Sequence, residues 1–262
     1  MFFQDKYKII EFCKIVTPLE GEFFLIKDCF KVLYDFILQS IDKPTSLSFA
    51  YNYGRKVWKT KEGFLKAINS LENKDVVNIM AYFNDNRSEN YFIINNPIMN
   101  LEHPPNLSSI SLEIIIDKKY FDKTLVNQLI HNMNDVYSFD YGYINDYRKK
   151  QKESKNNSVL EQKWIFHSMG VKEGYIKNVY EYNILNNTQI DQPIIKELIK
   201  ENIGGIVKLN DQLTIWRLDK SELKVAQKRL NQSQYVIVNT KNPDLFLETE
   251  DAKRFRKLME LK

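Results

Sequence analysis

The sequence has few of the residues that build phosphate-binding loops, disulfide frameworks and metal centres. Its 262 residues include only 8 glycines, 2 cysteines and 3 histidines. A loop that cradles phosphate needs clustered glycine because the backbone must approach the anion closely, and the chain contains neither a G-x-G-x-x-G nor a Walker pattern. The three histidines lie far apart and form no recognised metal-ligand spacing. We therefore expect no cofactor and no metal site.

Long apolar runs are also missing. No stretch approaches the roughly 20 uninterrupted apolar residues of a membrane helix. The first residues lack the basic start and apolar run of an export signal. The two cysteines, Cys13 and Cys29, are too few for a disulfide framework. These features predict a cytoplasmic protein without a membrane partner.

Aromatic and apolar residues are abundant by contrast. The chain is 43% hydrophobic, with 16 Phe, 15 Tyr and 3 Trp. This apolar area excludes a chain that is disordered throughout, and the length suits one large domain or two small ones.

The net charge of +4 is concentrated in one segment. Residues 147–157 contain five basic residues and one acidic residue, so the rest of the chain is close to neutral. A nucleic-acid-binding protein more often has basic residues along a face, interleaved with stacking aromatics. This segment has almost no apolar side chain to anchor it, so it argues against a nucleic-acid partner and predicts a solvated loop.

The periodicity of apolar residues predicts an alternation of strands and helices. Alternating residues from Ile110 to Ile116 give the clearest strand, and apolar residues three or four apart over 23–41 give the clearest helix. Further strands are expected at 7–16, 47–53, 76–83, 90–99, 138–144, 179–185, 206–209, 213–218 and 235–238, and helices at 61–72, 120–136, 193–202, 220–230 and 249–262. Adjacent strands joined as hairpins favour an α+β fold, with a mixed, largely antiparallel sheet flanked by amphipathic helices.

The best internal boundary is His103-Pro104-Pro105, because two prolines continue neither a helix nor a strand. We expect a single α+β domain over 1–262, with 1–104 and 105–262 as candidate sub-lobes. A loose recurrence of strand–helix–strand in the two halves leaves two similar lobes as an alternative arrangement.

One catalytic pattern is present in part. Asp140 or Asp146, followed by Glu161-x-Lys163, is similar to the Asp…Glu-x-Lys constellation of metal-dependent nucleases, in which carboxylates hold a divalent ion. Glu-x-Lys recurs by chance in a chain so rich in both residues, and Glu161 borders the basic segment instead of lying on a clear strand. A nuclease and a nucleic-acid-binding protein therefore remain the alternative interpretations.

A second pattern lies in the C-terminal 60% of the chain, from about Ser108 onward. It combines Tyr141-Gly142-Tyr143 after a long amphipathic helix with Tyr180, Tyr182, Asn183, Leu185, Asn186, Gln189, Pro193, Leu198-Ile199, Gly204-Gly205, Leu209, Leu213 and Trp216. This pattern resembles the immunity proteins of bacterial polymorphic-toxin and type VI secretion systems. The resemblance implies a cytoplasmic α+β protein that binds and silences a cognate effector toxin, and it brings no catalytic residues. We therefore expect a binding protein and not an enzyme.

Interfaces favour Tyr, Trp and Arg, and the region 141–182 is rich in them. Strand alternation places Tyr141 and Tyr143 on one face, where they could serve either the core or an interface. Four residues flank the polar segment instead, where burial inside the domain is harder to arrange. The sequence predicts a toxin-binding hot spot at Asp146, Tyr147, Arg148 and Trp164. The oligomeric state stays open.

Overall fold

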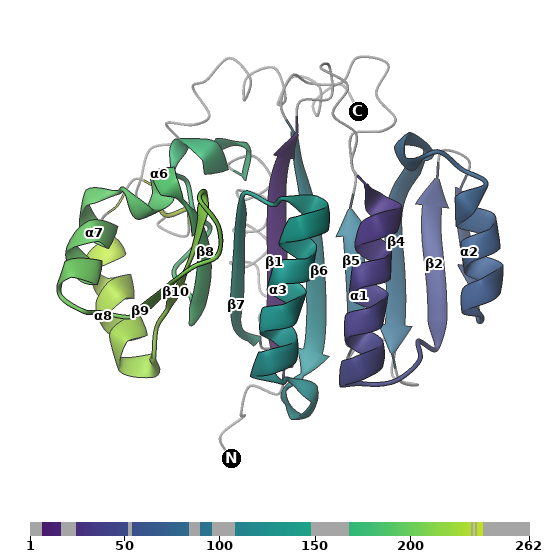
Figure 1. The fold of residues 1–262 in the computed structure, drawn as a ribbon, viewed down its shortest axis with the longest axis horizontal. Coiled ribbons are helices and arrows are strands. Elements are labelled where there is room, and N and C mark those ends of the chain that lie inside the picture. Colours follow the sequence, from purple (N-terminus) through teal and green to yellow (C-terminus); the bar gives the residue numbers. More distant parts are fainter. Residues whose placement is uncertain are drawn as a thin grey trace.

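The computed structural model describes residues 7–16, 25–51, 54–83, 90–95, 108–147, 168–231, 233 and 235–237. The strands are β1 (Tyr7–Val16), β2 (Ser46–Tyr51), β3 (Gly54–Trp58), β4 (Val76–Phe83), β5 (Asn90–Asn95), β6 (Ser108–Asp117), β7 (Tyr141–Tyr147), β8 (Tyr182–Asn186), β9 (Gly205–Lys208) and β10 (Leu213–Arg217). They form one ten-stranded sheet in the order β3-β2-β4-β5-β6-β1-β7-β8-β10-β9 (Figure 1).

Each pair of neighbouring strands in this sheet is antiparallel. The α+β fold expected from the sequence is confirmed. The sheet contains strands from both sides of the proline pair at 104–105, because β5 pairs with β6 and the N-terminal strand β1 lies between β6 and β7. The first strand of the chain is thus a central strand of the sheet, paired on both sides with later strands, β6 and β7.

Helices cover both faces of the sheet. They are α1 (Ile26–Ser40), α2 (Lys61–Asn69), α3 (Lys123–Tyr137), α6 (Asn187–Ile190), α7 (Pro193–Lys200) and α8 (Lys220–Leu230), with the short 3-10 turns η2 (Asn73–Asp75), η3 (Lys118–Tyr120) and η4 (Ser168–Glu173). Figure 1 shows α1 and α3 side by side in front of the central strands, and α7 and α8 at the opposite end of the sheet from α2. No helix of the described ranges is long and apolar enough to cross a membrane.

Strand β1 separates two hydrophobic cores because its alternate residues point to opposite faces. Ile10 and Phe12 belong to the core under α1, α2 and α3. Ile9 and Cys13 belong to the other core, which includes residues of η4, α7 and α8. A strand buried on both faces reads as a nearly continuous apolar run, as this one does, so the single acidic residue within it, Glu11, is conspicuous.

Local capping signals set several helix ends. Asp122 accepts hydrogen bonds from the backbone N–H groups of Thr124 and Leu125 at the start of α3. A capping box is present at the start of α8, with Asp219 and Glu222 each bonded to the other's backbone N–H. The sequence correctly predicted this helix start.

Other details differ from the sequence expectations. Strand β3 was not expected, and β8 begins at Tyr182 and not at 179, because the Asn183 side chain bonds to the backbone of Tyr180 and holds it in a loop. The helix expected at 193–202 begins at Pro193 but ends at Lys200; Gln192 precedes it without a capping side-chain hydrogen bond, and Asp191 closes α6. Within 235–237, where a strand was expected, Val236 forms an isolated bridge with Ile176. The expected helix at 249–262 lies outside the described residues.

Candidate functional site

The predicted hot spot falls at the end of β7. Its first two residues, Asp146 and Tyr147, close this strand, while Arg148 and Trp164 lie outside the described residues. Because Asp146 and Tyr147 are consecutive in a strand, they point to opposite faces of the sheet. Tyr147 is half-buried and packs against the core that contains η4, α7 and α8. The two therefore do not form one continuous contact surface by themselves.

Asp146 is held in a network of ion pairs. Lys8 Nζ lies 2.6 Å from its Oδ1 and Lys118 Nζ lies 2.6 Å from its Oδ2, and Lys8 also pairs with Glu181. Burial disfavours the charge, but hydrogen bonds from Lys118 and Lys8 outweigh it and lower the pKa of Asp146. The pKa of Lys8 is raised, since its bonds to Asp146 and Glu181 outweigh desolvation. The carboxylate is thus charged at neutral pH and held in position by its two lysines.

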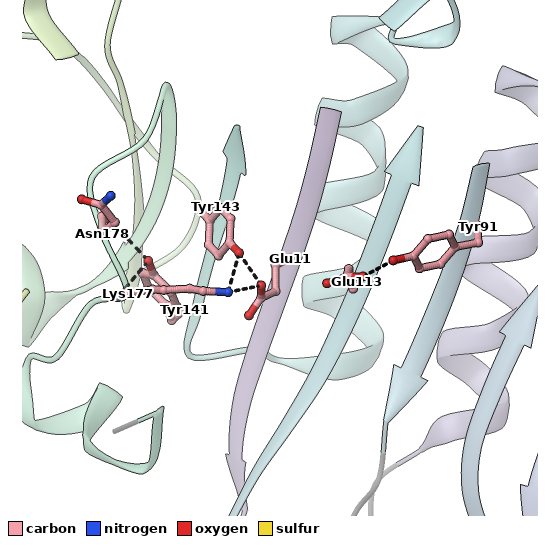
Figure 2. Close-up of polar contacts among 7 residues, drawn as sticks. All are labelled: Glu11, Tyr91, Glu113, Tyr141, Tyr143, Lys177 and Asn178. Atoms are coloured by element: carbon pink, nitrogen blue, oxygen red, sulfur yellow. Dashed lines mark hydrogen bonds and ion pairs between the residues drawn. The ribbon is translucent and has the colours of Figure 1, made fainter. Parts of the chain in front are cut away.

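A second polar cluster is buried on the other face of β1 (Figure 2). Lys177, from the segment between η4 and β8, places its Nζ 3.0 Å from Glu11 Oε2 and 2.9 Å from the Tyr143 hydroxyl. That hydroxyl donates to the same carboxylate, and Tyr143 lies directly opposite Glu11 in the pairing of β1 with β7. Exposed fractions of 2% for the Lys177 side chain and 7% for that of Glu11 make this a buried ion pair.

A further carboxylate lies next to this cluster. Glu113 of β6 is directly opposite Glu11 on the other side of β1, and like charges in that position repel. Each carboxylate has its own donors: Glu11 has Lys177 and Tyr143, and Glu113 accepts from the Tyr91 hydroxyl at 2.7 Å. Figure 2 shows the two groups of partners on either side of the carboxylate pair. Burial first, and the charge of Glu113 second, raise the pKa of Tyr91, so it stays protonated and keeps donating.

Tyr141 ties the backbone beside Lys177 to the sheet. Its hydroxyl accepts from the N–H of Lys177 at 3.3 Å and donates to the carbonyl of Asn178 at 3.5 Å. Burial raises the pKa of Tyr141 well above its ordinary value. Tyr141 and Tyr143 are 1% and 2% exposed, so of their two possible roles the structure assigns both to the core.

The hydrogen bonds and the ion pair of this cluster give it a structural role. Lys177, Glu11 and the tyrosine hydroxyls satisfy one another in a closely packed interior, which keeps buried polar groups from being unpaired. The neighbouring Cys13 is buried as well, and burial, followed by the charges of Glu11 and Asp140, raises the pKa of its thiol. It remains a thiol and is a poor nucleophile at neutral pH. The arrangement fixes the C-terminal elements onto the central strand.

Of the four residues in the partial nuclease pattern, the structure describes the two aspartates, Asp140 and Asp146. Asp140 Oδ2 accepts from the Ile15 N–H at 2.7 Å, and Asp146 is held by lysines. Glu161 and Lys163, like the basic segment over 148–157, lie outside the described residues. Across the part of the chain that the structure describes, no three His, Cys, Asp or Glu side chains are grouped so as to hold a metal ion.

The fold resembles that of a type VI secretion protein. The Pseudomonas aeruginosa T6SS protein PA0821 superposes with a TM-score of 0.54, covering 98% of this chain and 86% of that chain at 10% sequence identity. At this identity the likeness establishes the fold alone. No protein-family model matches the sequence, and no curated protein matches it.

The buried cluster was not predicted from the sequence, although one of its two charged residues, Glu11, stands out there. Glu11 occupies an inward position of an apolar strand, and a buried carboxylate requires a partner. That partner is 166 residues away in the sequence, and nothing local distinguishes Lys177 from the other lysines. The sequence could therefore reveal the need for a cation but not its identity.

Proposed function

We propose that this chain is an immunity protein that binds and neutralises a cognate effector toxin by protein–protein contact, without catalysis of its own. The observation that carries the proposal is a likeness along nearly the whole chain to a T6SS protein. It agrees with the secretion system to which the sequence resemblance points. The two arguments differ in kind, since one rests on short motifs and the other on the arrangement of the backbone.

The predicted contact residues fit a role in orienting the toxin. Lysines on both sides fix the Asp146 carboxylate, so little side-chain entropy is lost when a partner docks beside it. Tyr147 is half-exposed at the same strand end, and Arg148 and Trp164 add residue types that dominate interface energetics. We therefore keep Asp146, Tyr147, Arg148 and Trp164 as the proposed hot spot.

The proposal predicts that a toxin gene lies beside the gene for this chain, and the toxin domain that such a gene encodes is the test partner. Expression of the toxin domain should stop growth, and co-expression of this chain should restore it. Alanine at a central hot-spot residue should weaken binding of a catalytically inactive toxin domain by about 1–4 kcal/mol without unfolding the protein. If all four alanine variants bind like wild type, the interface lies elsewhere.

A control assay addresses the alternative function. The purified chain is incubated with DNA and RNA in the presence of Mg²⁺ or Mn²⁺, and we expect no cleavage. Cleavage that disappears in both Glu161→Ala and Lys163→Ala variants would establish the nuclease in place of the immunity protein.

A further inference from the structure

Arg217 closes strand β10, and two neighbouring side chains hold its guanidinium group. Its Nη2 donates to Asn127 Oδ1 of α3 at 2.9 Å, and the group lies 5.3 Å from the centre of the Tyr182 ring. Tyr182 is directly opposite Arg217 in the pairing of β8 with β10, and it packs against the core under α1, α2 and α3. Contacts from a helix and from a second strand therefore fix the orientation of this long side chain.

The guanidinium has donor groups that the fold leaves unused. Arginine carries only donors and no acceptor. Of its nitrogens, Nε alone is buried without a partner, so Nη1, which makes no hydrogen bond to a described residue, lies at the surface. No carboxylate of the described ranges lies within ion-pair distance of Arg217, whereas Arg229 binds both Glu197 and Glu201. Arg217 thus carries a charge that the described part of the chain does not neutralise.

An open space adjoins the guanidinium on the side of β9. Gly205 is directly opposite Arg217 in the pairing of β9 with β10, so a side chain at Gly205 would lie on the same face as Arg217. A Cβ added to Gly205 would have nothing within 4 Å. The glycine therefore leaves room beside the guanidinium for a group from another molecule.

The other charges on this face balance one another. Asp146 lies on the same face as Tyr182, because it alternates with Ile144, which is directly opposite Tyr182. The two lysines of the ion-pair network pair with Asp146 and Glu181, so one cation meets one anion in each case. Arg217 adds a single surplus positive charge. One carboxylate matches that charge, whereas the closely spaced phosphates of a nucleic acid call for many cations.

We propose that Arg217 binds a carboxylate of the toxin, from an Asp or Glu side chain that enters the space above Gly205. The carboxylate accepts hydrogen bonds from Nη1 and from the second N–H of Nη2. This inference rests on the proposed function and adds Arg217 and Tyr182 to the proposed hot spot. Both are residue types that dominate interface energetics, and a guanidinium that is already held in place loses little entropy when the partner docks.

The test supplies a carboxylate from within the chain. Gly205→Glu places a carboxylate beside Arg217 that competes with the toxin, whereas Gly205→Gln has a similar shape without the charge. Binding of the catalytically inactive toxin domain should be about tenfold or more weaker for Gly205→Glu than for Gly205→Gln, as for the loss of a charge-assisted hydrogen bond. Arg217→Gln should weaken binding by a similar factor. In the Arg217→Gln background the two variants at 205 should differ by less than about threefold.

A control variant separates this contact from a general effect of removing a cation. Arg229→Gln removes an arginine of α8, a helix that packs against the opposite face of the sheet, and toxin binding should not change. The free energy of unfolding is measured for every variant, so that affinities are compared only between folded proteins.

Chemical modification gives a readout that needs no substitution. Phenylglyoxal reacts with accessible guanidinium groups, and mass spectrometry quantifies the modified peptides. Arg217 should react in the free chain and be protected in the toxin complex, while the exposed Arg55, at the other edge of the sheet, should react in both. If a substituted chain does not fold, this protection decides the question.

The outcomes separate this inference from the proposed function. If wild type binds the toxin but Arg217→Gln and Gly205→Glu bind equally well, or Arg217 stays reactive in the complex, the carboxylate contact is wrong while the proposed function stands. If folded wild type does not bind the toxin, the proposed function itself fails. Binding of an oligonucleotide that Arg217→Gln abolishes would assign the guanidinium to a phosphate and overturn the proposal.

Discussion

Replacing Lys177 with methionine should strongly destabilise the fold. The change removes the ammonium group that lies 3.0 Å from Glu11 Oε2 and keeps most of the side-chain volume. Glu11 would remain buried opposite Glu113 and would lose its cationic partner, while the Tyr143 hydroxyl would still donate to it. Breaking a buried ion pair in this way costs about 3–5 kcal/mol. The free energy of unfolding is measured in urea, with circular dichroism and tryptophan fluorescence compared to establish that the transition is two-state.

A double-mutant cycle with Glu11→Gln separates the ion pair from general packing. The double variant should be more stable than the sum of the two single changes predicts, by about 1–3 kcal/mol, because each change alone removes the opposite charge from beside a buried charged group. Lys172→Met is the matched control, since this lysine is 58% exposed and lies 4.0 Å from Asp140. It should alter stability by no more than about 0.5 kcal/mol. A Lys177→Met variant as stable as the control would refute the anchoring role.

Three further predictions follow from other contacts. Gly204→Ala should lower the free energy of unfolding by about 2 kcal/mol or more, because φ is positive and a Cβ would lie 2.7 Å from a backbone carbonyl oxygen. Gly205→Ala is the control: its Cβ would lie in open space, and the free energy of unfolding should change by under about 0.5 kcal/mol. The lowered pKa of Asp146 and the raised pKa of Lys8 predict stabilisation that is present near neutral pH, lost as pH falls through the carboxyl pKa, and lost again as pH rises through the lysine pKa above 10.5. Burial raises the pKa of both thiols, Cys13 and Cys29, so Ellman's reagent at about pH 8 should react with neither in the native protein.

Each of these predictions has a contradicting result. Equal stability of the Gly204 and Gly205 variants would mean that the turn before β9 is not constrained as the structure has it. For the ion-pair network, the free energy of unfolding is measured for wild type and for Asp146→Asn at about pH 6 and pH 3. A difference between the two proteins that is no smaller at pH 3 would be inconsistent with the lowered pKa of the Asp146 carboxyl. Rapid native labelling of either thiol would mean that it is accessible, and denaturation should release two reactive thiols per chain.

The sequence predicted elements better than their connections. Residues 7–16 and 110–116 have patterns that define strands on their own, and both strands are present. No local signal shows that these two segments, about a hundred residues apart, are direct neighbours in the sheet. Strand β3 was missed because three of its residues, Arg55, Lys56 and Val57, are exposed and Trp58 alone packs against the core, so no alternating pattern marks it. Its pairing with β2 depends on tertiary context.

The candidate site shows the same limit in its chemistry. Strand alternation correctly placed Tyr141 and Tyr143 on one face, but it could not decide between core and interface, because that depends on what packs against the face. Lys177 packs against this face and bonds the Tyr143 hydroxyl, and it comes from an irregular segment with no sequence signature. Asp146 was expected to belong to the toxin-binding hot spot, and the structure shows its carboxylate paired with Lys8 and Lys118. Whether a toxin binds beside it stays a prediction.

The proposal predicts a toxin gene beside the gene for this chain. The most direct test of the central claim is binding between this purified chain and a catalytically inactive form of the toxin domain encoded there, measured by titration calorimetry. The immunity proposal predicts a stoichiometric complex, together with restored growth when this chain is co-expressed with the active toxin. Absence of both the complex and the protection, with the purified chain folded, would contradict the proposal.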